Sequence, residues 1–168
     1  MKPPARLQPG DRAPDFALRD ASGRTVALRD LLGKGPVVVY FYPKDNTKGC
    51  TAQACAFRDH YLVFKEAGAE VVGISTDSEA SHRAFAEQHD LPFILLSDPK
   101  GEVARAYGAT ALLGLMTGRV SFVLDERGTV RHVFNDLFHA TRHVDEALKV
   151  VRALSAAGQT PAAAPPHP

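Results

Sequence analysis

The sequence predicts an α/β protein with a central mixed β-sheet, helices on both faces and an N-terminal β-hairpin. Three segments carry the main signal, because each is nearly continuous in apolar residues, as strands buried on both faces are. They are PVVVYFYP (36–43), EVVGIST (70–76) and RVSFVLD (119–125). A helix is expected between the first two, and the order strand, helix, strand implies a right-handed parallel crossover.

That expected helix runs from about Thr51 to Ala67 and contains no proline. Its apolar residues recur at spacings of three and four, which predicts an amphipathic helix that ends at Gly68. They are Ala54, Phe57, Tyr61, Phe64 and Ala67. One face of this helix should therefore pack on the sheet.

Shorter elements follow the second strand. Asp77 or Ser78 can cap a helix that continues to about His89, and Pro92 stops it. A short strand over 93–96 then leads to Asp98, which is placed to cap a further short helix. These elements continue the alternation of strands and helices along the chain.

Turn signals place the remaining elements. Asp125–Gly128 is turn-like, so the third strand should return as a hairpin strand over 129–134. Asp20–Gly23 lies between two short apolar segments near the N-terminus and predicts the first hairpin. A final amphipathic helix is expected from about Arg142 to Leu154.

The length of 168 residues fits one domain, which we place at 1–154. Residues 155–168 read SAAGQTPAAAPPHP and are rich in alanine and proline. This composition is typical of disordered segments, and the prolines argue against a helix there. The sequence thus predicts one domain followed by a disordered C-terminal tail.

The charge balance excludes some partners. Lysine and arginine total 20 and aspartate and glutamate total 19, for a net charge of +1. Without a basic excess or a block of like charges, nucleic acid is not an expected partner. No apolar run approaches the roughly 18 residues of a membrane span, and the N-terminus lacks a secretory signal. We therefore expect a soluble, cytoplasmic chain.

Cys50 and Cys55 are the two cysteines of the chain, and both lie in the segment that follows the first buried strand. In a reducing cytosol such a pair is more often catalytic or metal-binding than a structural bridge. Cys50 falls at the start of the expected helix, where the helix dipole favours a thiolate, the reactive form of cysteine. The alternative is that Cys50 is a small buried hydrophobic residue.

Helix geometry limits how the two sulfurs can meet. Residues five apart in a helix have Cα atoms about 8.6 Å apart and point about 140° away from each other. A disulfide needs Cα atoms within about 7 Å. A bond between Cys50 and Cys55 would therefore require the first helical turns to unwind, which suits a catalytic cycle better than a resting structural bridge.

A metal site is the next alternative. Structural zinc commonly uses four ligands with closely paired cysteines, and this chain has one loosely spaced pair. His139 and His143 have helical spacing, but they flank the start of the last helix and are expected at the surface. We therefore expect no metal and no cofactor.

Three further residues are candidates for a site around the Cys50 thiol. Pro43 and Thr47 precede the cysteine in the spacing P-x3-T-x2-C, and the threonine hydroxyl can both donate and accept. Arg119 opens the third buried strand, so its guanidinium could reach the turn that carries Cys50, although the spacing alone favours a surface position. Such a cation would stabilise a thiolate and polarise an oxygen-bearing substrate.

The stretch YPKDNTKGCTAQACAFRD (42–59), together with APDF (13–16) and RVSFVLD (119–125), resembles the peroxiredoxins of the bacterioferritin comigratory protein or PrxQ type. The similarity extends from about Leu7 to Leu154.

The resemblance implies a thioredoxin-like fold with Cys50 as the peroxidatic cysteine and Cys55 as the resolving cysteine. It implies that Thr47, Pro43 and Arg119 complete a pocket for hydrogen peroxide or organic hydroperoxides. It also implies that thioredoxin or a similar dithiol is the reductant and that the protein is a monomer more often than a dimer.

Two departures from the family concern substrate and assembly. The family usually has proline before the Gly-Cys pair, whereas this chain has Lys48, so the loop should unwind more easily. The segment 109–118 is short and apolar for the family, which fits either a pocket for a lipid-like hydroperoxide or a contact with another subunit. The rival functions are a thiol–disulfide oxidoreductase and a non-enzymatic redox sensor or copper carrier on the same fold.

Overall fold

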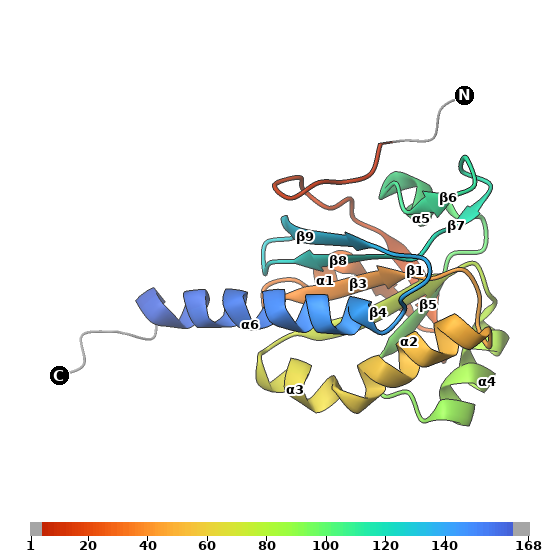
Figure 1. Ribbon diagram of the computed structural model, residues 1–168, viewed down its shortest axis with the longest axis horizontal. Coiled ribbons are helices and arrows are strands. Elements are labelled where there is room, and N and C mark those ends of the chain that lie inside the picture. The colour runs from red at the N-terminus through yellow and green to blue at the C-terminus, as the bar shows by residue number, and fades with distance from the viewer. Residues whose placement is uncertain (1–4, 163–168) are drawn as a thin grey trace.

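A mixed sheet of seven strands forms the centre of the protein, as predicted (Figure 1). The computed structural model describes residues 5–162. The strand order is β2-β1-β5-β4-β3-β8-β9. The strands are β1 (Ala17–Asp20), β2 (Thr25–Ala27), β3 (Val37–Phe41), β4 (Glu70–Ser75), β5 (Ile94–Ser97), β8 (Val120–Leu124) and β9 (Val130–Asn135).

The three apolar segments form the middle of this sheet. Strand β3 pairs in parallel with β4 and antiparallel with β8, and β4 pairs in parallel with β5. The predicted hairpins are confirmed, because β1 pairs antiparallel with β2 and β8 pairs antiparallel with β9. Every residue of β3 is buried, which explains why its sequence does not alternate between apolar and polar residues.

Helices cover both faces of the sheet, and the side chains of β3 divide between them. Val38 and Tyr40 pack on the face with α2, α3, α4 and α6, whereas Val37 and Val39 pack on the face with α1 and α5. The helices are α1 (Leu28–Leu31), α2 (Lys48–Asp59), α3 (Tyr61–Glu66), α4 (Glu79–His89), α5 (Glu102–Ala106) and α6 (Arg142–Ala162). Two apolar layers therefore enclose the central strands.

The single helix predicted after β3 is two helices. Helix α2 begins at Lys48 and ends at Asp59, and α3 begins at Tyr61. His60 between them has φ −106° and ψ 6°, outside helical values, and its backbone N–H is shared between two carbonyls of α2. The apolar spacing continues through this break, so the sequence pattern did not reveal it.

Helix α6 is longer than predicted. It continues to Ala162 rather than ending near Leu154, so the expectation that proline prevents a helix after Ser155 is wrong for residues 155–162. Alanine has the highest helix propensity, and Pro161 comes one residue before the helix ends. The expected tail over 163–168 lies outside the described residues, and the domain boundary stays a prediction.

A short hairpin that the sequence did not predict lies beside the sheet. Its strands are β6 (Thr110–Ala111) and β7 (Met116–Thr117). Between them Leu112 and Leu113 have φ values of 52° and 58°, a left-handed backbone conformation that residues other than glycine rarely adopt. These two leucines are exposed rather than packed in the core.

Candidate active site

Cys50 lies in the first turn of α2, where the chain has just left the carboxyl end of β3. Thr47 is the N-cap residue, and its carbonyl accepts the first helical hydrogen bond from Thr51 N–H at 2.8 Å. Asn46 before it has φ 63°, a left-handed conformation that asparagine tolerates better than most residues. The Cys50 side chain is only 1% exposed and therefore faces the protein interior.

Arg119 is the cation beside this sulfur. It directly precedes β8, and the pairing of Phe41 with Val120 places it next to the end of β3. Its Nη2 donates to Cys50 Sγ at 3.3 Å, and the residue is 5% exposed. A guanidinium keeps its charge at any physiological pH, so the buried sulfur lies beside a permanent positive charge. The surface position that the spacing alone favoured for Arg119 is therefore wrong, because the side chain is buried against Cys50, Gln53 and the Leu137 carbonyl.

Two acceptors hold the guanidinium in this position. Nη1 of Arg119 donates to Gln53 Oε1 at 2.7 Å, and Nε donates to the Leu137 carbonyl at 3.1 Å. Gln53 is fully buried, and its Nε2 has no hydrogen-bond partner among residues 5–162. Sequence reasoning missed Gln53, although its i,i+3 spacing from Cys50 puts both side chains on one face of α2.

Gly49 leaves the space that this contact needs. A Cβ atom at position 49 would lie 3.0 Å from Arg119 Nη2, closer than most real Cβ contacts. Since the guanidinium is already fixed by its other partners, it has little freedom to give way. Glycine before the cysteine therefore permits the close approach of cation and sulfur.

Thr47 and Pro43 lie in the loop before Cys50, but the structure does not join them to the sulfur. The Thr47 hydroxyl donates to the Lys44 carbonyl at 3.0 Å, and the residue is exposed. Pro43 is half-buried just after β3. Within residues 5–162, no hydrogen bond links Thr47 to Cys50, so the catalytic roles of Thr47 and Pro43 stay predictions.

Cys55 lies on α2 as well, half-buried, and both cysteines are free thiols. Because α2 is continuous from Lys48 to Asp59, helix geometry keeps the two sulfurs apart. This is the fully wound, reduced arrangement. A disulfide between the two sulfurs therefore requires α2 to unwind between Cys50 and Cys55.

Comparison with known proteins decides the family. Residues 9–133 match the AhpC/TSA family. The chain is 52% identical over 151 residues to the chloroplastic peroxiredoxin Q of Sedum lineare, an alignment that covers 89% of this chain and 81% of that protein. The chain belongs to the peroxiredoxin family. It is also 50% identical over 151 residues to the chloroplastic peroxiredoxin Q of Populus jackii, covering 89% of this chain and 70% of that protein.

Solved peroxiredoxin structures share the fold. The peroxidoxin BcpB of Mycobacterium tuberculosis superposes with a TM-score of 0.83 at 41% identity, covering 89% of this chain and 99% of that one. Peroxiredoxin Q of Xanthomonas campestris gives 0.75 at 30% identity, covering 83% and 91%. The expected thioredoxin-like fold is confirmed. As a peroxiredoxin, the chain is a thiol peroxidase, so the rival functions are not favoured.

His143 is a buried histidine that is close enough to Arg119 to feel its charge. The sequence prediction of a surface position for His143 is wrong, because the residue is fully buried between α6 and the sheet. Its Nε2 donates to the Asp136 carbonyl at 2.8 Å, and its Nδ1 accepts from the Ser121 hydroxyl at 2.8 Å. Burial, with the nearby charge of Arg119, lowers the pKa of His143 to about 4. The ring is therefore neutral at pH 7.

One group of side chains within residues 5–162 has ligand atoms close enough to share an ion: Asp45, Asp77 and His82. Both ring nitrogens of His82 are already hydrogen-bonded, Nδ1 to Asp45 and Nε2 to the Leu96 carbonyl. A metal would have to displace one of these bonds. The cluster is accordingly a hydrogen-bonded network.

Proposed function

We propose that this peroxiredoxin reduces hydrogen peroxide and organic hydroperoxides with Cys50 as the peroxidatic cysteine and Cys55 as the resolving cysteine. The observation that carries the proposal is the 3.3 Å contact between Arg119 Nη2 and Cys50 Sγ. It pairs a buried sulfur with a permanent positive charge at a helix N-terminus, and both features stabilise a thiolate. Thioredoxin or a similar dithiol protein serves as the reductant.

In the first step the Cys50 thiolate attacks the terminal oxygen of the hydroperoxide. The S–O bond forms as the O–O bond breaks, and the electron pair leaves with the other oxygen, which takes a proton and departs as water or an alcohol. Sulfur is oxidised to a sulfenic acid. Arg119 donors stabilise charge on the oxygens during this step, and Thr47 and Pro43 shape the pocket.

In the second step the first turns of α2 unwind and the Cys55 sulfur attacks the sulfenic sulfur. The S–S bond forms, the S–O bond breaks, and hydroxide leaves with the proton of Cys55 as water. The dithiol partner then supplies two electrons by thiol–disulfide exchange and restores both thiols. A resting thiol–disulfide oxidoreductase would instead hold its two sulfurs within bonding distance at one helical turn.

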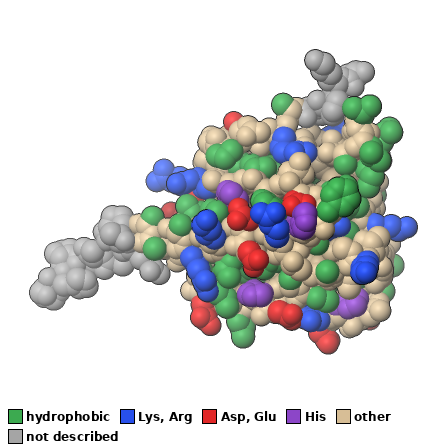
Figure 2. All heavy atoms as spheres, in the orientation of Figure 1, with side chains coloured by type: hydrophobic (Ala, Val, Ile, Leu, Met, Phe, Trp, Pro, Cys, Tyr) green, Lys and Arg blue, Asp and Glu red, His purple; other side chains and the backbone are tan. Residues whose placement is uncertain are grey.

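The apolar β6–β7 loop supports organic hydroperoxides as substrates. Leu112, Leu113 and Leu115 are exposed by 68%, 90% and 85%, and the hairpin ends two residues before Arg119. Figure 2 shows hydrophobic side chains along the edge of the molecule that β6 and β7 occupy in Figure 1. The bacterioferritin comigratory protein of Xanthomonas campestris has alkyl peroxide reduction activity. An alkyl chain would find apolar contacts at this edge.

The two cysteines also bear on the compartment in which the protein works. Two free thiols on one helix fit a reducing compartment, and we propose the cytoplasm, although the relatives from plants are named chloroplastic. Among residues 5–162, no helix has the length and apolar character needed to cross a membrane.

We propose that the protein works as a monomer. Sedimentation of the reduced and the oxidised protein tests this point.

A coupled assay tests the function directly. Peroxide consumption is followed with thioredoxin, its reductase and NADPH, and the wild-type protein should turn over continuously. Cys50→Ser should abolish the activity, whereas Cys55→Ser should give one rapid oxidation without recycling by thioredoxin. A redox sensor would stop after about one equivalent of peroxide. Full activity in Cys50→Ser would overturn the assignment.

A further inference from the structure

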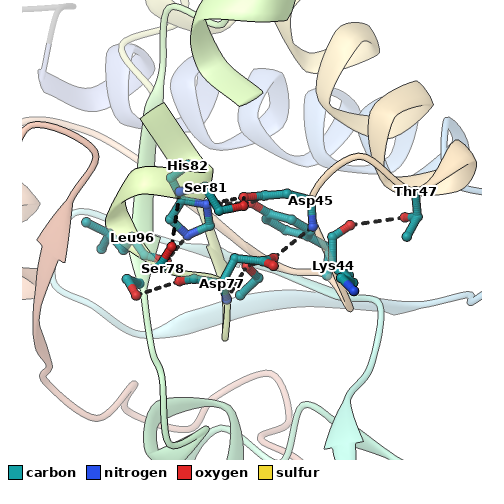
Figure 3. A network of polar contacts seen from close by, with 11 residues as sticks. Lys44, Asp45, Thr47, Asp77, Ser78, Ser81, His82 and Leu96 are labelled. Carbon is teal, nitrogen blue, oxygen red and sulfur yellow. Dashed lines mark hydrogen bonds and ion pairs between the residues drawn. The ribbon is translucent and has the colours of Figure 1, made fainter. Parts of the chain in front are cut away.

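A buried polar network fastens the loop before Cys50 to helix α4 (Figure 3). Asp45 is the loop residue at its centre, and its side chain is 1% exposed. One carboxylate oxygen accepts from Tyr42 Oη at 2.6 Å. The other accepts from His82 Nδ1 at 2.7 Å and from Ser81 Oγ at 2.9 Å. Two side chains of α4 and one residue directly after β3 therefore converge on one loop carboxylate.

Both ring nitrogens of His82 have a partner. Nδ1 lies 2.7 Å from Asp45 Oδ2, Nε2 lies 2.9 Å from the Leu96 carbonyl, and the ring is fully buried. Asp45 and His82 therefore form a buried hydrogen-bonded pair. Loss of one partner of such a pair is costly because a buried polar group is left without its hydrogen bond.

The loop backbone is held at the same residue. Asp45 N–H donates to Asp77 Oδ2 at 2.7 Å, and that carboxylate oxygen also accepts from Ser75 Oγ at 2.7 Å. Directly after Asp45 the chain passes from the interior to the surface, since residues 46–48 are all exposed. The side-chain hydrogen bond of Thr47 goes back into the loop, to the Lys44 carbonyl. Asp45 is thus the last firmly anchored residue before Cys50.

We propose that Asp45 and His82 are positioning residues whose pair holds the loop before Cys50 in the wound state of α2 and is released when α2 unwinds. The inference rests on the proposed function, because it presupposes that Cys50 and Cys55 join. In this proposal the Asp45 side chain leaves His82 as α2 unwinds, so the pair stabilises the wound state alone.

The pair sets the balance between two states of the loop. In the wound state Cys50 contacts Arg119 and reacts with peroxide, and in the unwound state it reaches Cys55. Contacts made in the wound state shift the balance toward it by their own free energy. A weakened Asp45–His82 pair should therefore slow oxidation of Cys50 and accelerate formation of the disulfide. Each rate should change by about tenfold, because the loss of one buried hydrogen bond typically costs about 1–3 kcal/mol.

The experiment measures both rates separately. Rapid mixing with one equivalent of hydrogen peroxide, acid quenching and mass spectrometry resolve the sulfenic acid and the disulfide as distinct species. The variants are His82→Leu and Asp45→Asn, with Ser81→Ala as a milder change that removes one donor to Asp45. The matched control is Ser78→Ala, because the Ser78 hydroxyl caps α4 by accepting from Ser81 N–H at 3.1 Å and is not among the hydrogen-bond partners of Asp45 within residues 5–162.

Opposite shifts of the two rates in the network variants, with Ser78→Ala close to wild type, support the inference. Parallel losses of both rates, or unchanged rates in all three network variants, overturn it. Ser81→Ala keeps the test valid if the stronger variants fail to fold, because it leaves the contact between Asp45 and His82 in place. Failure of the proposed function has a different signature, namely peroxide turnover in Cys50→Ser.

Discussion

Nη2 of Arg119 lies 3.3 Å from the Sγ of Cys50, although 69 positions separate the two residues in the chain. The antiparallel pairing of β3 with β8 makes this contact possible, because it aligns the end of one strand with the start of the other. The contact provides a buried sulfur with a fixed cation. Most of the chemistry proposed above depends on it.

Replacement of Arg119 should therefore impair oxidation of Cys50. For Arg119→Met we expect the second-order rate constant with hydrogen peroxide to fall by about 10²-fold to 10³-fold, the usual effect of removing one preorganised donor. Arg119→Lys should recover part of the loss, because it restores charge without the planar fork. Competition with a reference peroxidase measures the rate. Arg105→Lys, an exposed substitution, is the control, and an Arg119→Met rate equal to that of the control would contradict the assignment.

Gln53 should contribute by holding Arg119 in place. In Gln53→Ala the guanidinium loses its 2.7 Å acceptor, and we expect the peroxide rate constant to fall by about tenfold. Gln53→Glu should also slow the reaction, because a carboxylate competes with the Cys50 thiolate for the same cation. Gln88→Ala on the exposed side of α4 is the matched control. A rate unaffected by both Gln53 substitutions would show that the Leu137 carbonyl alone positions Arg119.

Tyr40 carries a buried hydroxyl that has no hydrogen-bond partner among residues 5–162. Its ring stacks on Phe57 with centroids 4.6 Å apart. Burial, with the negative charge of Cys50 as a further cause, raises the pKa of Tyr40 well above its usual value, so the phenol stays neutral.

Tyr40→Phe keeps the stacking and removes the unpaired group. We expect the free energy of unfolding to stay equal or rise by about 1 kcal/mol in urea denaturation. Tyr42→Phe is the comparison, because it removes a hydroxyl that donates to Asp45 at 2.6 Å and should destabilise the fold. A Tyr40→Phe protein less stable than Tyr42→Phe would contradict this assignment of partners.

His143 should make stability depend on pH. Its pKa is about 4 in the folded protein and near 6.5 when unfolded, so the unfolded state binds the extra proton between these values. The contribution of neutral, buried His143 to the free energy of unfolding is fully present above about pH 6.5. It decreases as the pH falls toward 4, by about 3 kcal/mol in total. Urea denaturation across this range should show the decrease in wild type and a smaller one in His143→Gln. His139→Gln, at an exposed histidine, is the control, and equal slopes in all three proteins would refute the prediction.

Local sequence patterns could predict the scaffold of the site. The apolar segments revealed β3, β4 and β8, and the position of Cys50 at a helix start followed from the end of β3. Contacts between distant residues could not be predicted in this way. Gln53 and Arg119 are 66 positions apart, and Asp45 and His82 are 37 apart. A polar side chain is usually read as exposed, so the burial of these residues becomes visible only when their partners are known.

The burial of His143 could not be predicted from the sequence either, because its energy depends on partners that are distant in the chain. A histidine near a helix start is usually solvated, but here two specific partners, Ser121 and the Asp136 carbonyl, compensate for burial. The break at His60 and the length of α6 were missed for another reason. Periodicity reports which face of a helix is apolar, and it says little about where the backbone hydrogen bonds stop.

The most direct test of the account is the mass and the free-thiol count of the reduced protein after one equivalent of hydrogen peroxide. We predict that both free thiols disappear and that the mass falls by about 2 Da, because Cys50 and Cys55 have joined in one internal disulfide. Arg119→Met should reach the same product much more slowly. Retention of both thiols, or oxidation of Cys50 with Cys55 left free, would contradict the account.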